Sequence, residues 1–200
     1  MILALTGSSV DGSLYRDVVD LARRSPGWLD GVVAAWSAYG LTVFAVLMLV
    51  GWWRARGVAA AAAMTALAVP VAVLVAFAAD SGLKLLVRED RPCRNLPFRT
   101  LEACPAPGDY AFPSNHTAIA IAAAVALFFV SRRLGRVASG FAVAMAASRV
   151  WVGAHYPHDV IAGALVGGLV AFLAMTVLRR WASGPAGRLA ATRLRPLLVA

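Results

Sequence analysis

The sequence predicts an all-α integral membrane protein, a bundle of about five transmembrane helices with an interfacial amphipathic helix at its N-terminal end. Two observations support this fold class. The 200-residue chain is 60% hydrophobic and only 14% charged, which is far from the composition of an ordinary soluble domain. Two apolar stretches, residues 31–53 and 58–79, are long enough to cross a bilayer, which takes about 20 residues, and three shorter apolar stretches follow them. Too few polar residues remain to cover a soluble bundle.

The first predicted element is an amphipathic helix at residues 11–24. Its residues Leu14, Val18 and Ala22 share one face at helical spacing, and the charged residues lie largely off that face. This pattern is typical of a helix that lies in the membrane interface. A helix packed against the bundle would show the same pattern, so both placements remain open.

Five apolar segments follow, and we interpret them as transmembrane helices. The predicted spans are residues 31–53, 58–79, 114–131, 137–154 and 159–179. The sequence contains no internal repeat and no sign of a second domain, so residues 1–182 are predicted to form a single membrane-embedded domain. Residues 183–200 contain arginines and no acidic residue, which predicts a basic cytoplasmic tail attracted to anionic lipid.

Charge divides unevenly between the two sides that five spans create. One side carries ten arginines and no acidic residue, whereas all ten acidic residues fall on the other side with nine basic ones. The positive-inside rule places the arginine-only side, with the C-terminus, in the cytoplasm. The net charge of +9 follows from this topology and does not indicate nucleic-acid binding, because no basic and aromatic residues interleave on a soluble surface.

The two cysteines of the chain, Cys93 and Cys104, both lie in the outward loop between the second and third spans. A disulfide is expected there if the compartment is oxidising, and two unpaired thiols are the alternative. Two cysteines offer too few ligands for a zinc site, and no cluster of outward carboxylates has metal-ligand spacing. The sequence therefore predicts no metal site and no cofactor.

Three polar clusters converge on the outward side, and the first is KLLVREDRP at residues 84–92. The chain has 18 arginines and a single lysine, Lys84, which indicates a need for a compact ammonium group at this position. Lys84 and Arg91 could hold two oxygens of one phosphate. Snorkelling of Lys84 to the membrane interface is the alternative.

The second cluster is FPSNHTAI at residues 112–119, which opens the third span. Ser114 is a good N-cap, and the start of a helix offers free N–H groups and the positive end of its dipole to an anion. His116 lies in the first turn, where it can face that anion. A capping serine beside a wet interfacial histidine would give the same pattern.

The third cluster is SRVWVGAHYPHD at residues 148–159, between the last two spans. Asp159 follows His155 by four residues and can reach one imidazole nitrogen, which leaves the other free as a nucleophile. Arg149 supplies a guanidinium for phosphate. No role is evident for His158, which we interpret as a solvated interfacial residue.

Together these clusters predict a phosphoryl-transfer site that needs no metal. Clustered positive charge would stabilise the equatorial oxygens of the transition state. His155 would attack phosphorus and form a phosphohistidine, while His116 would protonate the leaving oxygen and later take a proton from water. The groups predicted to hold the phosphate are Lys84, Arg91, Arg149 and the N–H groups near Ser114.

The spacing of the three clusters resembles the signature of the type 2 phosphatidic acid phosphatase superfamily, which shares its site with vanadium haloperoxidases. Six residues separate Lys84 from Arg91–Pro92, PSNH follows, and five residues separate Arg149 from a histidine that precedes Asp159 by four. The resemblance implies that His155 is the nucleophile, His116 the acid and base, and Asp159 the orienting carboxylate. Its implied phosphate-binding residues are Lys84, Arg91, Ser114, Asn115 and Arg149, with Asn115 standing where the commonest pattern has glycine.

The chain is most similar to bacterial undecaprenyl pyrophosphate phosphatases of the bacitracin-resistance type, in its small size, its helix order and the amide within PSNH. This likeness implies removal of the terminal phosphate from undecaprenyl or decaprenyl pyrophosphate, a membrane lipid, on the extracytoplasmic face of the bacterial inner membrane, to recycle the peptidoglycan carrier. The alternatives are a phosphatidic acid or phosphatidylglycerophosphate phosphatase of the same family and, from another class, an inactive lipid-binding or transport protein. The clustering of charges at span ends argues against transport.

Overall fold

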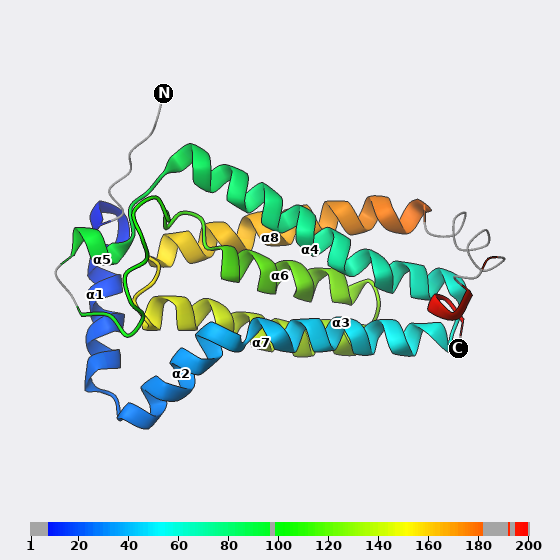
Figure 1. The fold of residues 1–200 in the computed structure, drawn as a ribbon, viewed down its shortest axis with the longest axis horizontal. Helices are drawn as coiled ribbons and strands as arrows, with labels where there is room; N and C mark the ends of the chain where they lie inside the picture. Colours follow the sequence, from blue (N-terminus) through cyan, green and yellow to red (C-terminus); the bar gives the residue numbers. More distant parts are fainter. Residues whose placement is uncertain (1–7, 97–98, 182–191, 193–194, 200) are drawn as a thin grey trace.

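The computed structural model describes residues 8–96, 99–181, 192 and 195–199, and it is all-α over these residues (Figure 1). No β-strand occurs within these ranges, and the predicted fold class, an all-α membrane bundle, is confirmed. The helices are α1 Ser8–Arg24, α2 Gly27–Tyr39, α3 Leu41–Arg56, α4 Ala60–Val87, α5 Pro92–Asn95, α6 Asn115–Phe128, α7 Arg132–Trp151, α8 Pro157–Trp181 and the 3-10 turn η1 Arg195–Leu197.

Helix α6 forms the centre of the bundle, where it packs against α3, α4, α7 and α8 (Figure 1). The core around it includes Phe44 of α3, Met145 of α7 and Met175 of α8. Small side chains let helix backbones approach closely inside a membrane. The buried small residues of α6 are Ala118, Ala120, Ala122, Ala123, Ala124 and Ala126.

The apolar helices have the character of membrane spans. Within the described residues, two segments are long and apolar enough to cross a membrane: α4 continued by α5, and α8. Helices α2 and α3 are long and apolar enough when taken together, as a pair bent by 53°. Helix α6 is apolar but has 14 residues, about 21 Å at 1.5 Å per residue, which is shorter than a hydrocarbon core of about 30 Å. The chain is therefore a multi-pass membrane protein in which the short α6 is enclosed by longer neighbours.

The predicted span at residues 31–53 is divided at Gly40 into α2 and α3. A Cβ atom at Gly40 would lie 2.5 Å from the carbonyl oxygen of Trp36 and 2.8 Å from Cε of Met145. The missing side chain thus makes room for Met145 of α7 inside the bend. The second predicted span, residues 58–79, is longer in the structure, because α4 continues to Val87 and ends only where Arg88 adopts a φ of 55°.

Helix α1 lies across one end of the bundle (Figure 1). It contacts α7 and α8, and its residues Tyr15, Val19 and Ala22 are buried. The Tyr15 hydroxyl donates a hydrogen bond to the carbonyl oxygen of Gly153 at 3.0 Å. Tyr15, Val19 and Ala22 thus pack against the bundle, as one of the two placements that the sequence left open requires, whereas Leu14 is 52% exposed.

Most of the predicted basic tail, residues 183–200, lies outside the described residues. In its described part, the carbonyl oxygen of Leu197 accepts a hydrogen bond from Nε1 of Trp52 at 2.9 Å. This contact places η1 beside α3, at the end of the bundle opposite α1 (Figure 1).

Candidate active site

The side chains predicted to be functional gather at the end of the bundle that α1 crosses. Helices α4 and α7 end there, and α6 and α8 begin there (Figure 1). Every predicted site residue lies at one of these helix ends or in the loop next to it: Lys84, Arg91, Ser114, Asn115, His116, Arg149, His155 and Asp159. The topology thus brings three segments that are distant in sequence to the same place.

Two glycines of α8 allow its backbone to touch that of α6. A Cβ atom at Gly163 would lie 2.6 Å from the carbonyl oxygen of Ser114, and one at Gly167 would lie 2.3 Å from that of Ala118. The N–H of Ser114 also donates a hydrogen bond to the carbonyl oxygen of Asp159 at 3.0 Å. This small-residue packing fixes the start of α6 against the start of α8.

We expect Gly163→Ala to destabilise the protein, because the added methyl group has only backbone atoms of Ser114 to displace. Overpacking of this kind costs about 1–3 kcal/mol, which should lower the midpoint of thermal unfolding in detergent. The matched control is Gly140→Ala in α7, where a Cβ meets no atom within 4 Å and the midpoint should hold or rise slightly. Equal midpoints for the two variants would contradict the proposed contact.

His155 is held in one orientation by groups on both sides of its ring. Its Nε2 lies 3.3 Å from Nη1 of Arg91, and because a guanidinium only donates, Nε2 must accept and Nδ1 must carry the proton. Nδ1 lies 3.4 Å from Oδ2 of Asp159, which also accepts the N–H of Tyr156 at 2.8 Å. The unprotonated nitrogen therefore points to the arginine, and the protonated one faces the carboxylate.

His155 is buried, with 1% of its surface exposed. Burial lowers the pKa of its imidazole well below the ordinary value, and the charges of Arg91, Arg149 and Lys84 lower it further. The ring is therefore neutral near neutral pH, which is the state that a nucleophile requires. The same three cations, Arg91, Arg149 and Lys84, are among the residues that the sequence predicts to bind phosphate.

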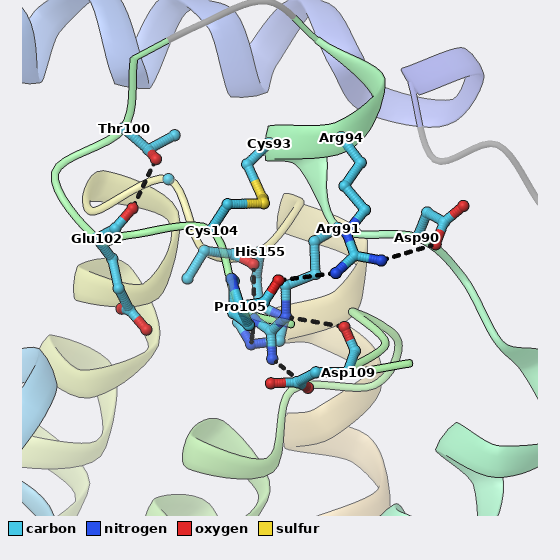
Figure 2. Close-up of a disulfide and its surroundings, with 12 residues drawn as sticks. Asp90, Arg91, Cys93, Arg94, Thr100, Glu102, Cys104, Pro105, Asp109 and His155 are labelled. Carbon is cyan, nitrogen blue, oxygen red and sulfur yellow. Dashed lines mark hydrogen bonds and ion pairs between the residues drawn. A yellow bond between two sulfur atoms is a disulfide. The ribbon is translucent and has the colours of Figure 1, made fainter. Parts of the chain in front are cut away.

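Arg91 ties the loop before α6 to the loop before α8. Its Nη1 donates to the carbonyl oxygen of Ala154 at 3.0 Å, its Nη2 to Oδ1 of Asp109 at 2.8 Å, and its Nε to the carbonyl oxygen of Asp109 at 3.3 Å. Figure 2 shows the guanidinium between Asp109 and His155. In this structure the carboxylate of Asp109 thus binds the guanidinium group of Arg91, which was predicted to bind phosphate.

Arg149 is paired in the same way. Its two Nη atoms donate to the two carboxylate oxygens of Glu102 at 2.9 and 3.2 Å, and Nη1 also donates to Oγ of Ser37 in α2. Arg149 is 3% exposed, and it borders a cavity of about 330 Å³ together with His116. The residues that line the cavity are Ala34, Ser37, Ala38, Leu101, Glu102, His116, Arg149 and Val152.

The remaining predicted phosphate-binding residues have different partners. Nζ of Lys84 donates to the carbonyl oxygens of Tyr110 and Ala111 at 2.9 and 3.4 Å, so this ammonium holds the loop before α6 and does not snorkel away from it. Ser114 occupies the N-cap position of α6, but its side chain makes no capping hydrogen bond. The side-chain oxygen of Asn115 is buried and finds no hydrogen-bond partner among the described residues.

A disulfide joins Cys93 and Cys104 in the loop above the site (Figure 2). Arg94 donates a hydrogen bond to the carbonyl oxygen of Pro105 at 2.7 Å. The N–H of Glu102 donates to the carbonyl oxygen of Val152 at 3.1 Å. These bonds attach the loop to itself and to the end of α7. They place Glu102 over the guanidinium of Arg149.

His158 is not a solvated residue as the sequence suggested, and that interpretation was wrong. Its Nδ1 lies 2.8 Å from Oδ1 of Asp11, and its Nε2 lies 3.0 Å from Oε1 of Glu89 and 3.3 Å from Oδ1 of Asp159. The side chain is only 19% exposed. Glu89, His158 and Asp159 also form a group whose ligand atoms lie within 4.8 Å of one another, a spacing at which a metal ion fits and which the sequence did not reveal.

Sequence reasoning thus missed the acidic partners of the site. Glu102 and Asp109 stand in a loop without a recognisable motif, and Asp11 and Glu89 lie 147 and 69 residues from the histidine that they contact. Their position on the predicted outward side, which they share with all the other acidic residues, was the one feature of the sequence that placed them near the site. No feature of the sequence indicated the contact of Ser37 with Arg149, because Ser37 is a single hydroxyl within an apolar span.

Comparisons with known proteins agree with this arrangement. The family model of the PAP2 superfamily matches residues 65–183, which include all three clusters. The chain is 30% identical over 145 residues to undecaprenyl-diphosphatase BcrC of Bacillus subtilis, a match that covers 72% of each protein. It is 31% identical over 159 residues to an undecaprenyl-diphosphatase of Sulfolobus acidocaldarius, covering 74% of this chain and 70% of that protein.

Two solved structures have a similar fold. The crystal structure of Aquifex aeolicus LpxE superimposes with a TM-score of 0.64 at 19% identity, covering 88% of this chain and 99% of that one. A PAP2-type phosphatidylglycerolphosphate phosphatase from Bacillus subtilis gives the same TM-score and identity, covering 84% of this chain and 86% of that one. The family match, the two relatives and the three converging clusters together show that this chain belongs to the PAP2 superfamily and is a membrane-embedded lipid phosphatase.

Proposed function

We propose that this phosphatase removes the terminal phosphate from a polyprenyl pyrophosphate, undecaprenyl or decaprenyl pyrophosphate, through a phosphohistidine and without a metal ion. The observation that carries the proposal is His155, a buried neutral imidazole whose Nε2 faces Arg91 and whose Nδ1 faces Asp159. The substrate class is supported by the two undecaprenyl-diphosphatases, which the chain matches over more than two thirds of its length.

In the proposed first step, the terminal phosphate replaces the carboxylates of Asp109 and Glu102 on the two guanidinium groups. Nε2 of His155 attacks phosphorus, the bond from phosphorus to the bridging oxygen breaks, and His116 gives that oxygen a proton. Asp159 stabilises the charge that develops on the His155 ring. Lys84, Arg91, Arg149, Ser114 and Asn115 are the groups proposed to bind the phosphate.

In the second step, His116 takes a proton from water, which attacks the phosphohistidine and releases inorganic phosphate. The products are the polyprenyl monophosphate and phosphate, and His155 returns to its neutral form. Arginines and an ammonium group supply the charge that the three equatorial oxygens need, so the residues in hand suffice for both steps.

We further propose that the site opens on the extracytoplasmic face of the bacterial inner membrane, where it would recycle the carrier lipid of peptidoglycan synthesis. The support is the charge distribution. The far end of the bundle carries Arg54, Arg56, Arg132, Arg133, Arg136, Arg179 and Arg180 and no acidic residue, which is typical of a cytoplasmic side.

The test is phosphate release by the purified protein from undecaprenyl pyrophosphate, phosphatidylglycerophosphate and phosphatidate in one detergent, with and without EDTA. We expect the pyrophosphate to react fastest and EDTA to have no effect. Faster release from either phospholipid would overturn the substrate. Loss of release in EDTA that Mg²⁺ restores would show that the reaction needs a metal ion and would overturn the proposed mechanism, and no release from any lipid would favour a lipid-binding or transport role.

A further inference from the structure

His158 contacts two carboxylates that are both fully buried. Glu89 and Asp159 are each 0% exposed, and Nε2 of His158 lies 3.0 Å from Oε1 of Glu89 and 3.3 Å from Oδ1 of Asp159. Within the described part of the chain, no ion pair joins either carboxylate to a lysine or an arginine. Two buried anions this close together are stable only if a cation accompanies them.

The hydrogen bonds of the ring show that His158 is that cation. Nδ1 faces Oδ1 of Asp11 at 2.8 Å, and Nε2 faces Glu89. Ionised carboxylates only accept hydrogen bonds, and a neutral imidazole has a single N–H to donate. Since both ring nitrogens face carboxylate oxygens, the ring that satisfies these contacts with ionised acids is an imidazolium.

The position of the ring is fixed from every side. The backbone N–H of His158 donates to Oδ2 of Asp11 at 2.7 Å. The ring stacks on Tyr156 and on Phe112, with centroid distances of 5.5 and 6.0 Å. These contacts come from α1, from the loop before α6 and from the loop before α8, so the imidazolium is a built part of the site and not a mobile surface group.

The catalytic carboxylate depends on this ring. Oδ2 of Asp159 is used by His155 and by the N–H of Tyr156, whereas Oδ1 is buried and finds no hydrogen bond among the described residues. Burial and the neighbouring Glu89 oppose the charge of Asp159, and His158 and Lys84 favour it. Nε2 of His158 lies 3.3 Å from Oδ1, so without the imidazolium Asp159 would have only the neutral ring of His155 paired with it among the described residues.

We propose that His158 is a positioning residue for the phosphatase reaction: it keeps Asp159 ionised beside the buried Glu89, so that Asp159 can orient and stabilise the ring of His155. This inference rests on the proposed function of His155 and Asp159. It assigns His158 no contact with substrate, so its loss should reduce kcat and leave KM unchanged.

The experiment compares phosphate release by the wild type, His158→Gln and the double variant E89Q/H158Q, at saturating and limiting lipid. Glutamine keeps hydrogen bonds to the acids but removes the charge, and we expect kcat to fall about tenfold or more with KM unchanged. The double variant removes one anion together with the cation, so we expect it to recover most of the lost kcat. The matched control, D17N/H158Q, removes an exposed carboxylate of α1 instead and should recover nothing.

Recovery by E89Q and not by D17N is a result that a merely structural role of His158 would not give. A wild-type kcat in His158→Gln, or a loss of activity that E89Q fails to recover, would overturn the proposal. A wild-type protein inactive on every lipid phosphate would instead refute the proposed function, so the two failures are distinguishable.

Discussion

Replacing His155 with alanine is expected to abolish phosphate release, with a loss of kcat of at least about 10³-fold. Removal of a covalent nucleophile costs this much or more in enzymes of known mechanism. The neutral ring of His155 lies between Arg91 and Asp159, which is the arrangement that the proposed nucleophile requires. The measurement is phosphate release under saturating lipid, with protein detected at the wild-type elution volume.

The variant must keep its fold for this result to bear on mechanism. The ring of His155 contributes one contact to Arg91 and one to Asp159, and Arg91 keeps its bonds to Ala154 and Asp109 without it. The variant should therefore remain folded in detergent, with a thermal midpoint lowered by the cavity that the buried ring leaves. Turnover retained in a folded His155→Ala variant would show that the nucleophile is another group.

Arg91→Gln is expected to lower kcat by about 10²–10³-fold, the cost of removing one group that stabilises developing charge on oxygen. Arg91 is 7% exposed, and its guanidinium lies 3.3 Å from Nε2 of the proposed nucleophile His155. Arg91→Lys should lose most of the same activity, since an ammonium group cannot contact Ala154, His155 and a phosphate at once.

The matched control for Arg91 is Arg88→Gln, three residues earlier. Arg88 is exposed, and its Nε donates a hydrogen bond to the carbonyl oxygen of Leu85 at the end of α4. Its replacement removes the same charge from the same loop and should leave kcat within about twofold. Equal losses in the two variants would mean that Arg91 acts through the net charge of the loop and not through its contacts.

The sequence predicted which residues meet, because each cluster stands at the end of an apolar helix. Five spans force the ends of α4 and α7 and the starts of α6 and α8 onto one side, whatever the details of packing. His155 stands two residues before α8 and Asp159 lies in the first turn of that helix, so the carboxylate can reach back to the ring. The disulfide partners were also recognisable, since the chain has only two cysteines.

The acidic partners of the site could not be predicted in the same way. Glu102 reaches Arg149 across 47 residues and Asp109 reaches Arg91 across 18, and both contacts depend on the path of a loop without secondary structure. The role of His158 depends on Asp11 in α1 and Glu89 after α4, two elements whose packing the sequence left open. The bend at Gly40 was missed because apolar composition alone predicts a straight span at residues 31–53.

The claim that His155 is the phosphoryl acceptor in a pocket made by three distant segments is tested most directly by trapping the intermediate. Radiolabelled pyrophosphate lipid is mixed with enzyme and quenched in alkaline denaturant within milliseconds, and the labelled peptide is sequenced. We predict label on the imidazole of His155 in the wild type and none in His155→Ala. Turnover without labelled protein, or label on any other residue, would contradict the mechanism.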